Sequence, residues 1–174
     1  MEEKNKENRQ RLMDAFASED FQKEIYQYRS DIELELTKFL EWMQGELKPS
    51  QKIFHSPESR IKSKTGFNEK INRKDYVNKW DLSGDVRNIQ EEILKELSDL
   101  IGFRITCYFM DDEEDIYRGL HRYYQQIGFQ NIELNFDEGT EQANGHKLYK
   151  VSGHYKGKVS FELQIKAMVH NVWG

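Results

Sequence analysis

The sequence predicts an α+β (mixed α/β) domain, in which a mainly antiparallel sheet is flanked by helices and preceded by N-terminal helices. In the first half of the chain, apolar residues recur at steps of three and four, the period of an amphipathic helix. In the second half, several segments alternate apolar and polar residues, as strands with one buried face do. The 174 residues are 37% hydrophobic, which suits one sizeable core better than two.

The N-terminal region is expected to be helical. Its longest helix spans residues 19–45, with Ser18 as the N-cap and Gly45 at the end. A shorter helical stretch precedes it. We therefore expect residues 1–52 to form a helical region packed on the remaining part, residues 53–174.

A basic segment follows at residues 60–74, in a chain whose formal net charge is -5. Arg60 and Lys62 are two positions apart, as on one face of an extended segment, whereas Lys70 follows Phe67 at helical spacing. An extended cationic arm would thus lead into a cationic helix. The segment is either a solvated charged face, the commoner case, or a binding site for an anion.

The segment after residue 85 predicts a helix and then a strand. Asp85 sits where a negative charge favours the dipole at the start of the helix, and residues 103–109 alternate as a strand with one buried face. Asp99 then stands just before the strand, and Arg104 lies on its polar face. The single cysteine, Cys107, falls in the apolar set, which favours a buried hydrophobic role over a nucleophilic one.

An acidic run, DDEED, occupies residues 111–115 at the expected start of the next helix. Its composition could attract a metal ion. At a helix start such residues more often face solvent and interact with the helix dipole. We favour that structural interpretation.

The last third of the chain predicts a strand over residues 132–136 and a hairpin formed by residues 146–155 and 159–167. In the second hairpin strand, Glu162 and Gln164 alternate with apolar neighbours and so point away from the core. They share the polar side of the sheet with Arg104.

Asp99 and Glu162 come from different strands and are accompanied by arginine and lysine. Carboxylates bind Mg²⁺ through oxygen, and cationic side chains neutralise the charge of a polyphosphate. This combination is the one that magnesium-dependent nucleotidyl or phosphoryl transfer requires, although spacing alone does not prove it.

Four ordered motifs carry a family resemblance, and they read RIKSKTGFNEKINRK, DLIGFRI, ANG and FELQIKA. Together they resemble the synthetase domain of RelA/SpoT alarmone synthetases, especially the small stand-alone members, over about residues 53–174. The resemblance implies a nucleotidyltransferase-like fold. It also implies a reaction in which the β,γ-pyrophosphate of ATP passes to the ribose 3′-hydroxyl of GDP or GTP.

The resemblance assigns roles to individual residues. It implies that Asp99 and Glu162 are the catalytic and Mg²⁺-binding carboxylates, with Glu162 also orienting or deprotonating the attacking hydroxyl. The expected ATP-binding residues are Arg60, Lys62, Lys70 and Arg104. The expected acceptor-binding residues are Asn144, His146, Lys147 and Gln164.

The acceptor half departs from the family pattern. Gln142 stands where a lysine is expected to contact the acceptor's phosphates, and His146 replaces the tyrosine expected to stack on guanine. An imidazole can still stack on a base, and Lys147 or Lys150 could supply the missing charge. In the last motif, Lys166 stands in place of arginine, which keeps the charge but loses the bidentate fork.

Three functions therefore remain open. The first is a small alarmone synthetase that makes guanosine tetra- or pentaphosphate. The second is a toxin-like relative that pyrophosphorylates the 3′ end of tRNA or makes an adenosine analogue. A tRNA acceptor would need an extended basic surface. Apart from the basic segment already assigned to ATP, the only candidates are four lysines near one another in the sequence: Lys147, Lys150, Lys156 and Lys158. The third is a non-catalytic nucleotide-sensing module, against which the retention of both carboxylates argues.

Several expectations concern the protein as a whole. The absence of a membrane-length apolar run and of a signal-peptide pattern predicts a cytoplasmic protein. No His/Asp hydrolase motif accompanies the synthetase motifs. The final residues, AMVHNVWG, resemble the first turns of a helix, so we expect the domain to be truncated at its C-terminus. The oligomeric state is open, a homo-oligomer included.

Overall fold

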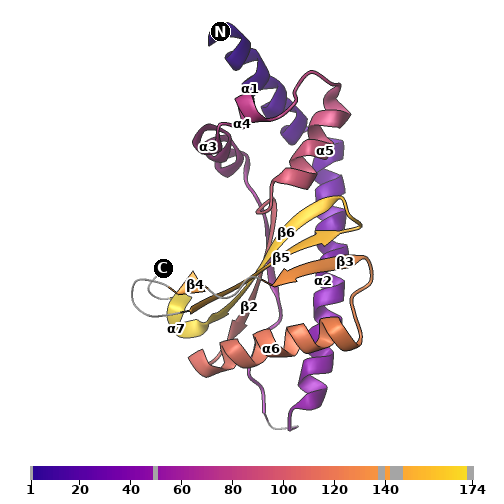
Figure 1. Cartoon of the computed structure of the whole chain (residues 1–174), viewed down its shortest axis with the longest axis vertical. Coiled ribbons are helices and arrows are strands. Elements are labelled where there is room, and N and C mark those ends of the chain that lie inside the picture. Colours follow the sequence, from indigo (N-terminus) through magenta and orange to yellow (C-terminus); the bar gives the residue numbers. More distant parts are fainter. Residues whose placement is uncertain (1, 49–50, 137–139, 142–146, 172–174) are drawn as a thin grey trace.

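A computed structural model of the chain describes residues 2–48, 51–136, 140–141 and 147–171. It begins with helices α1 (Glu2–Ala17) and α2 (Glu19–Glu46), separated by Ser18. The Ser18 side chain accepts a hydrogen bond from the backbone N–H of Phe21 and so caps α2, as predicted. Helix α2 runs along most of the molecule, with α1, α3, α4 and α5 grouped towards one end and α6 towards the other (Figure 1).

Five further helices follow in the described part of the chain. They are α3 (Lys64–Lys74), α4 (Tyr76–Lys79), α5 (Val86–Glu96), α6 (Met110–Gln126) and α7 (Met168–Asn171). The Asp85 side chain, expected to favour the start of α5 by its charge, also caps the helix by accepting a hydrogen bond from the Asn88 N–H at 2.9 Å. Every helix among the described residues is too short or too polar to span a lipid bilayer.

The strands are β1 (Glu58–Ile61), β2 (Ile101–Cys107), β3 (Ile132–Phe136), β4 (Thr140–Glu141), β5 (Lys147–Tyr155) and β6 (Val159–Ala167). The sheet order is β1-β2-β6-β5-β3, and β4 pairs with β5. Only β2 and β6 are parallel among the strand pairs that the structure describes. The mainly antiparallel α+β fold is therefore confirmed.

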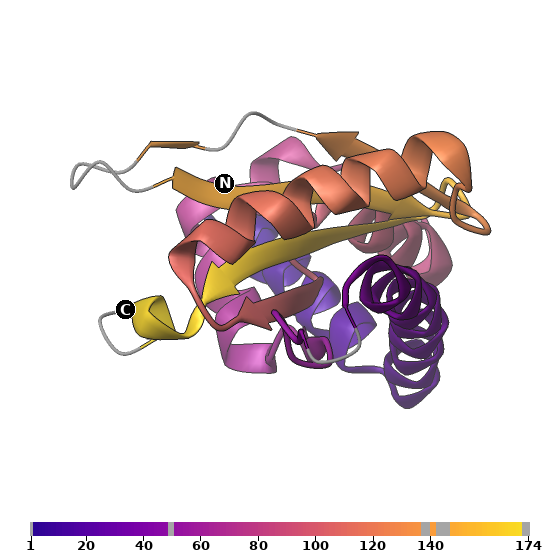
Figure 2. The same ribbon diagram turned by 90° about the horizontal axis from the view of Figure 1, so that it is seen from below.

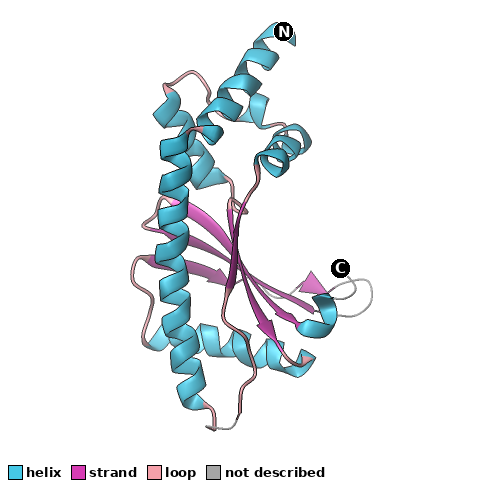
Figure 3. Ribbon diagram, turned by 180° about the vertical axis from the view of Figure 1, so that it is seen from behind, coloured by secondary structure: helices cyan, strands magenta, loops and turns pink. Residues whose placement is uncertain are grey.

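One face of the sheet is apolar and covered by helices. Helix α2 packs on β1 and β2, and α6 packs on β2, β5 and β6. Figure 2 shows α6 lying across the strands, and Figure 3 shows α2 running beside the twisted sheet. The covered face contributes Ile101, Phe161 and Leu163 to a hydrophobic cluster that extends from α1 to β6, and Ile61 packs against this cluster.

The predicted strand 103–109 is displaced in the structure. Strand β2 starts at Ile101 and ends at Cys107, and Phe109 is 72% exposed instead of buried. The reason is local, because the chain turns directly into α6 and Asp112 accepts a hydrogen bond from the Phe109 N–H at 3.0 Å. Cys107 itself is buried, as predicted.

Candidate functional site

A carboxylate lies between two lysines where three elements meet. Asp99 precedes β2, Lys62 follows β1 and Lys70 lies on α3. The Lys62 Nζ is 2.8 Å from Asp99 Oδ2, and the Lys70 Nζ is 2.5 Å from Asp99 Oδ1. Both lysine side chains are less than 15% exposed. We call these three residues the lysine–aspartate cluster.

The cluster is held by the backbone and by charge. The Lys62 N–H donates to the Leu100 carbonyl at 2.9 Å, which ties the end of β1 to the start of β2. Burial alone would raise the pKa of Asp99, but the hydrogen bonds and charges of Lys62 and Lys70 outweigh burial and lower the pKa. Asp99 is therefore a carboxylate at neutral pH.

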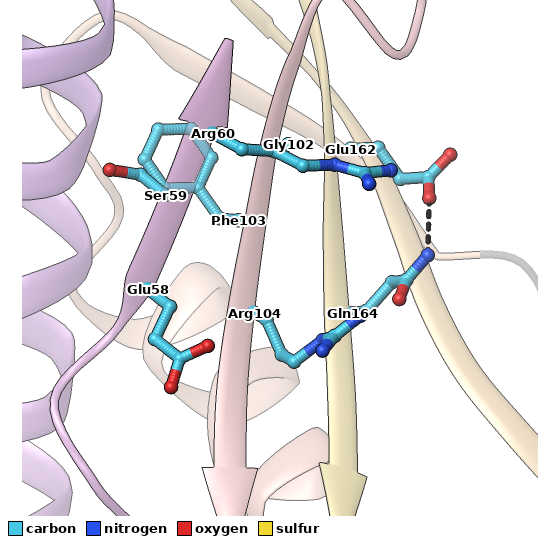
Figure 4. A pocket seen from close by; sticks show the side chains of 8 residues that line it. All are labelled: Glu58, Ser59, Arg60, Gly102, Phe103, Arg104, Glu162 and Gln164. Carbon is cyan, nitrogen blue, oxygen red and sulfur yellow. Dashed lines mark hydrogen bonds between the residues drawn. The ribbon is translucent and has the colours of Figure 1, made fainter. Parts of the chain in front are cut away.

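A pocket of about 180 Å³ opens on the polar face of the sheet, over β1, β2 and β6 (Figure 4). Two cross-strand rows build it. Arg60, Gly102 and Glu162 occupy paired positions on the three strands, and Glu58, Arg104 and Gln164 occupy the next row. Side chains two residues apart point to the same face of a strand, so both rows project into the pocket.

Gly102 gives Arg60 room to cross the sheet. A Cβ atom at position 102 would lie 3.3 Å from Arg60 Nε and 3.4 Å from Arg60 Cγ. The Arg60 side chain thus extends over the glycine towards β6, with Arg104 below it on the same face (Figure 4). Two guanidinium groups from adjacent strands therefore line one small pocket.

Glu162 lies at the far side of this pocket with both carboxylate oxygens engaged. Gln164 Nε2 donates to Oε1 at 2.6 Å, and Lys150 Nζ on β5 is 2.7 Å from Oε2. The Glu162 side chain is 13% exposed. Its charge is thus paired on the β5 side, away from Arg60.

The structure brings the predicted site residues into two adjacent groups. Arg60, Arg104, Glu162 and Gln164 line the pocket, whereas Lys62, Lys70 and Asp99 form the lysine–aspartate cluster. Strand β1 connects the groups, because Arg60 and Lys62 are two residues apart. Asp99 and Glu162 pair with different lysines.

The remaining predicted acceptor residues are not placed. Asn144 and His146 lie outside the described residues, and Gln142 does as well. For Lys147 the structure describes only the backbone, at the start of β5.

Glu58 also lines the pocket, although it is not among the residues predicted for the site. The alternation that joins Arg60 to Lys62 could also have indicated Glu58, two residues before Arg60. The sequence suggests Lys150 as a positive charge for the acceptor but shows no link between Lys150 and Glu162. That link depends on the pairing of Lys150 with Gln164 across β5 and β6, which no local pattern reveals.

Lys150 is also separated from two of the lysines considered for tRNA. Lys156 and Lys158 lie in the turn at the far end of the hairpin, and six residues of β-strand span roughly 20 Å. These side chains therefore do not form one patch with Lys150.

The acidic run at the start of α6 has structural contacts. Asp112 caps the helix, and Glu114 pairs with Arg118 at 2.5 Å. Glu113 differs from the expected solvent-facing role, because it is only 1% exposed and accepts a hydrogen bond from the Ala167 N–H at 2.5 Å. It therefore fixes the end of β6.

Solved structures with this fold come from small alarmone synthetases and related proteins. Small alarmone synthetase 1 from Bacillus subtilis, bound to its product pppGpp, has a TM-score of 0.58 at 18% identity, covering 86% of this chain and 72% of that one. The same protein bound to AMPCPP has a TM-score of 0.54 at 18% identity, with 86% and 69% covered. A GTP pyrophosphokinase family protein from Streptococcus pneumoniae has a TM-score of 0.61 at 17% identity, with 89% and 71% covered.

The sequence itself also matches a family. None of the curated proteins compared with the sequence matches it. The family model described as "Region found in RelA / SpoT proteins" matches residues 59–174, which contain the lysine–aspartate cluster and every pocket residue except Glu58. The chain therefore belongs to the RelA/SpoT family.

Proposed function

We propose that this protein is an ATP-dependent pyrophosphokinase that transfers the β,γ-pyrophosphate of ATP to the ribose 3′-hydroxyl of GDP or GTP, making (p)ppGpp. The observation that carries the proposal is the continuity of the two groups along β1. A pocket lined by two arginines lies next to an ionised aspartate held by two lysines. A nucleoside triphosphate needs both parts, one for its base and one for its phosphates.

Arg60 and Arg104 would bind the base of ATP. A guanidinium group is planar and stacks on aromatic faces, so two of them can flank a purine ring. Both arginines line the pocket of about 180 Å³ over β1, β2 and β6, which supports this role.

Lys62 and Lys70 would bind the phosphates of ATP. In the structure their ammonium groups hydrogen-bond to Asp99, which has the same type of acceptor oxygen as a phosphate. Incoming phosphates can take over these hydrogen bonds, since lysine is a flexible point charge. The exchange would free the Asp99 carboxylate.

Asp99 and Glu162 are the residues that would hold Mg²⁺. Among the described residues, no group of three or more acidic, histidine or cysteine side chains is arranged to hold a metal ion. Two carboxylates nevertheless suit Mg²⁺, which is commonly bound by one or two carboxylates together with substrate phosphates. When bound, the ion neutralises charge on the transferring phosphates.

The proposed transfer breaks one bond and forms one. The 3′-hydroxyl oxygen of the acceptor bonds to the β-phosphorus of ATP, and the bond from that phosphorus to the oxygen bridging the α-phosphate breaks. AMP leaves with the electron pair. Glu162 accepts the hydroxyl proton and passes it to solvent, while Lys62 and Lys70 stabilise the phosphate charge.

Support for a guanine nucleotide as acceptor comes from the fold neighbours. Small alarmone synthetase 1 was solved with pppGpp as its product, and another neighbour is named for GTP pyrophosphokinase. Both share the fold with this chain.

The test is a labelling experiment with the full chain, γ-labelled ATP and Mg²⁺. Separate reactions contain GDP, GTP, no second nucleotide, or deacylated tRNA. We expect label on GDP and GTP, with one AMP released per product. Label on tRNA alone, or on an adenosine product alone, would show that this molecule, and not GDP or GTP, is the acceptor. ATP binding without transfer to any acceptor would favour the nucleotide-sensing module.

A further inference from the structure

Lys150 occupies a distinctive position relative to Glu162. It lies on β5 opposite Gln164, and its ammonium reaches back one row to Glu162 Oε2 at 2.7 Å. Its side chain is 44% exposed, whereas that of Glu162 is 13% exposed. A partly exposed cation thus covers one oxygen of a largely buried carboxylate.

The sheet order places Lys150 on the opposite side of Glu162 from the proposed ATP site. Arg60 and Lys62 belong to the β1 edge, Arg104 to β2, and Glu162 to β6. Lys150 lies one strand further, on β5. With ATP over β1 and β2, the space over β5 is left for the acceptor, and Glu162 lies between the two.

We propose that Lys150 is a specificity-determining residue that senses the acceptor's phosphates and, on binding them, uncovers Glu162. This inference rests on the proposed function. Before the acceptor arrives, the ammonium occupies Oε2 of Glu162. When a phosphorylated acceptor binds over β5, Lys150 exchanges the carboxylate for a phosphate, and Oε2 becomes available to the 3′-hydroxyl proton.

The exchange agrees with the contacts of Glu162. The carboxylate keeps its hydrogen bond from Gln164 at 2.6 Å, so it stays oriented after Lys150 leaves. Lysine has a long flexible stem. A terminal phosphate carries a charge of about -1.5 to -2 at pH 7, which is more negative than that of a carboxylate. An acceptor without phosphates would leave the Lys150–Glu162 pair closed. Water, which has no phosphate, would be a poor acceptor for the same reason.

The test compares Lys150→Met with wild type. The matched control is Lys23→Met, which removes an ammonium from an ion pair of the same length, 2.7 Å to Glu19 Oε1, on the exposed surface of α2. For each protein, kcat and KM are measured for GDP, GTP and guanosine, and AMP release is measured without any acceptor. Lys150→Gln is a second neutral variant, in case the methionine variant does not fold.

The preference for GDP is the value of kcat/KM for GDP divided by that for guanosine. We expect Lys150→Met to lower this preference at least tenfold, mainly by raising the KM for GDP. AMP release without acceptor should rise severalfold. Lys150→Arg should restore the preference for GDP, since it keeps the charge. Lys23→Met should match wild type in every measurement.

Two outcomes would overturn the inference while leaving the proposed function intact. One is an unchanged GDP-to-guanosine ratio in Lys150→Met. The other is an equal loss of activity with both acceptors, which would mean that Lys150 only supports Glu162. Failure of the proposed function is recognised separately, because the wild-type protein would then transfer no label to any guanine acceptor.

Discussion

The side chain of Arg60 lies across Gly102, so that a Cβ atom on Gly102 would be 3.3 Å from Arg60 Nε. Contacts of 3.0–3.4 Å are tighter than nine in ten real Cβ contacts, and the guanidinium side chain would have to move by a few tenths of an ångström. The absence of a side chain at position 102 thus sets the path of an arginine that lines the pocket.

Gly102→Ala should therefore weaken ATP binding about three- to tenfold, because the shifted Arg60 no longer flanks the base correctly. Calorimetric titration with ATP measures this. Gly45→Ala is the control, since nothing lies within 4 Å of that position in α2. It should leave ATP affinity unchanged and stabilise the protein by up to about 1 kcal/mol, the usual gain for this change in a helix. Equal ATP affinity in both variants would contradict the proposal that Arg60 binds the base of ATP.

Glu113 should be important for stability, in contrast to its neighbour Glu114. Glu113→Ala leaves the buried N–H of Ala167 without its acceptor, which costs about 1–3 kcal/mol in the free energy of unfolding. Glu114→Ala removes only an exposed pair with Arg118, worth about 0.5 kcal/mol or less. Urea denaturation of the two variants measures the difference. Similar losses would contradict the role of Glu113 in fixing β6.

Local sequence patterns predicted the parts of this fold that depend on near neighbours. The capping residue Ser18 marked the start of α2, the charge of Asp85 marked the start of α5, and alternation placed Glu162 and Gln164 on one face of β6. These features are decided within a few residues. Phe109 shows the limit, because its place in the alternating pattern was overridden by the turn into α6.

The site itself depends on pairings between distant strands. Arg60, Gly102 and Glu162 come together only through the register of β1, β2 and β6, including the parallel β2–β6 pair. A shift of one residue would point every one of these side chains to the other face. The family motifs therefore named most of the residues, but the pairing of Lys150 with Glu162 required the structure.

The thiol of Cys107 should be unreactive in the folded protein. Burial, together with the charges of Glu113 and Asp112, raises the pKa of its thiol to about 12. The reactive thiolate is therefore scarce at pH 8, and the sulfur is inaccessible. A thiol reagent at pH 8 should modify Cys107 only after denaturation. Rapid modification of the native protein would show that the end of β2 opens readily.

Acid should remove the stabilising contribution of Asp99. The lysines lower its pKa in the folded state below the ordinary value of 3.8, so the folded protein binds a proton there less readily than the unfolded chain does. The contribution is fully present above 3.8 and is lost as the pH falls through the lower folded pKa. The stability difference between wild type and Asp99→Asn should therefore be constant from pH 5 to 7 and should shrink towards pH 2. A difference that grows on acidification would contradict the ion pairing.

Asp99→Asn should separate phosphate binding from transfer. The substitution removes the negative charge that Lys62 and Lys70 contact in the absence of ligand, so both ammonium groups become more available to phosphate. ATP binding measured with a chelator present should tighten about tenfold, which corresponds to ~1.4 kcal/mol. Transfer with Mg²⁺ should fall at least a hundredfold, because one of the two proposed metal-binding carboxylates is lost. Lys70→Met should weaken ATP binding under both conditions. If Asp99→Asn instead weakened metal-free ATP binding as much as Lys70→Met does, Lys62 and Lys70 would pair with Asp99 without binding the phosphates of ATP.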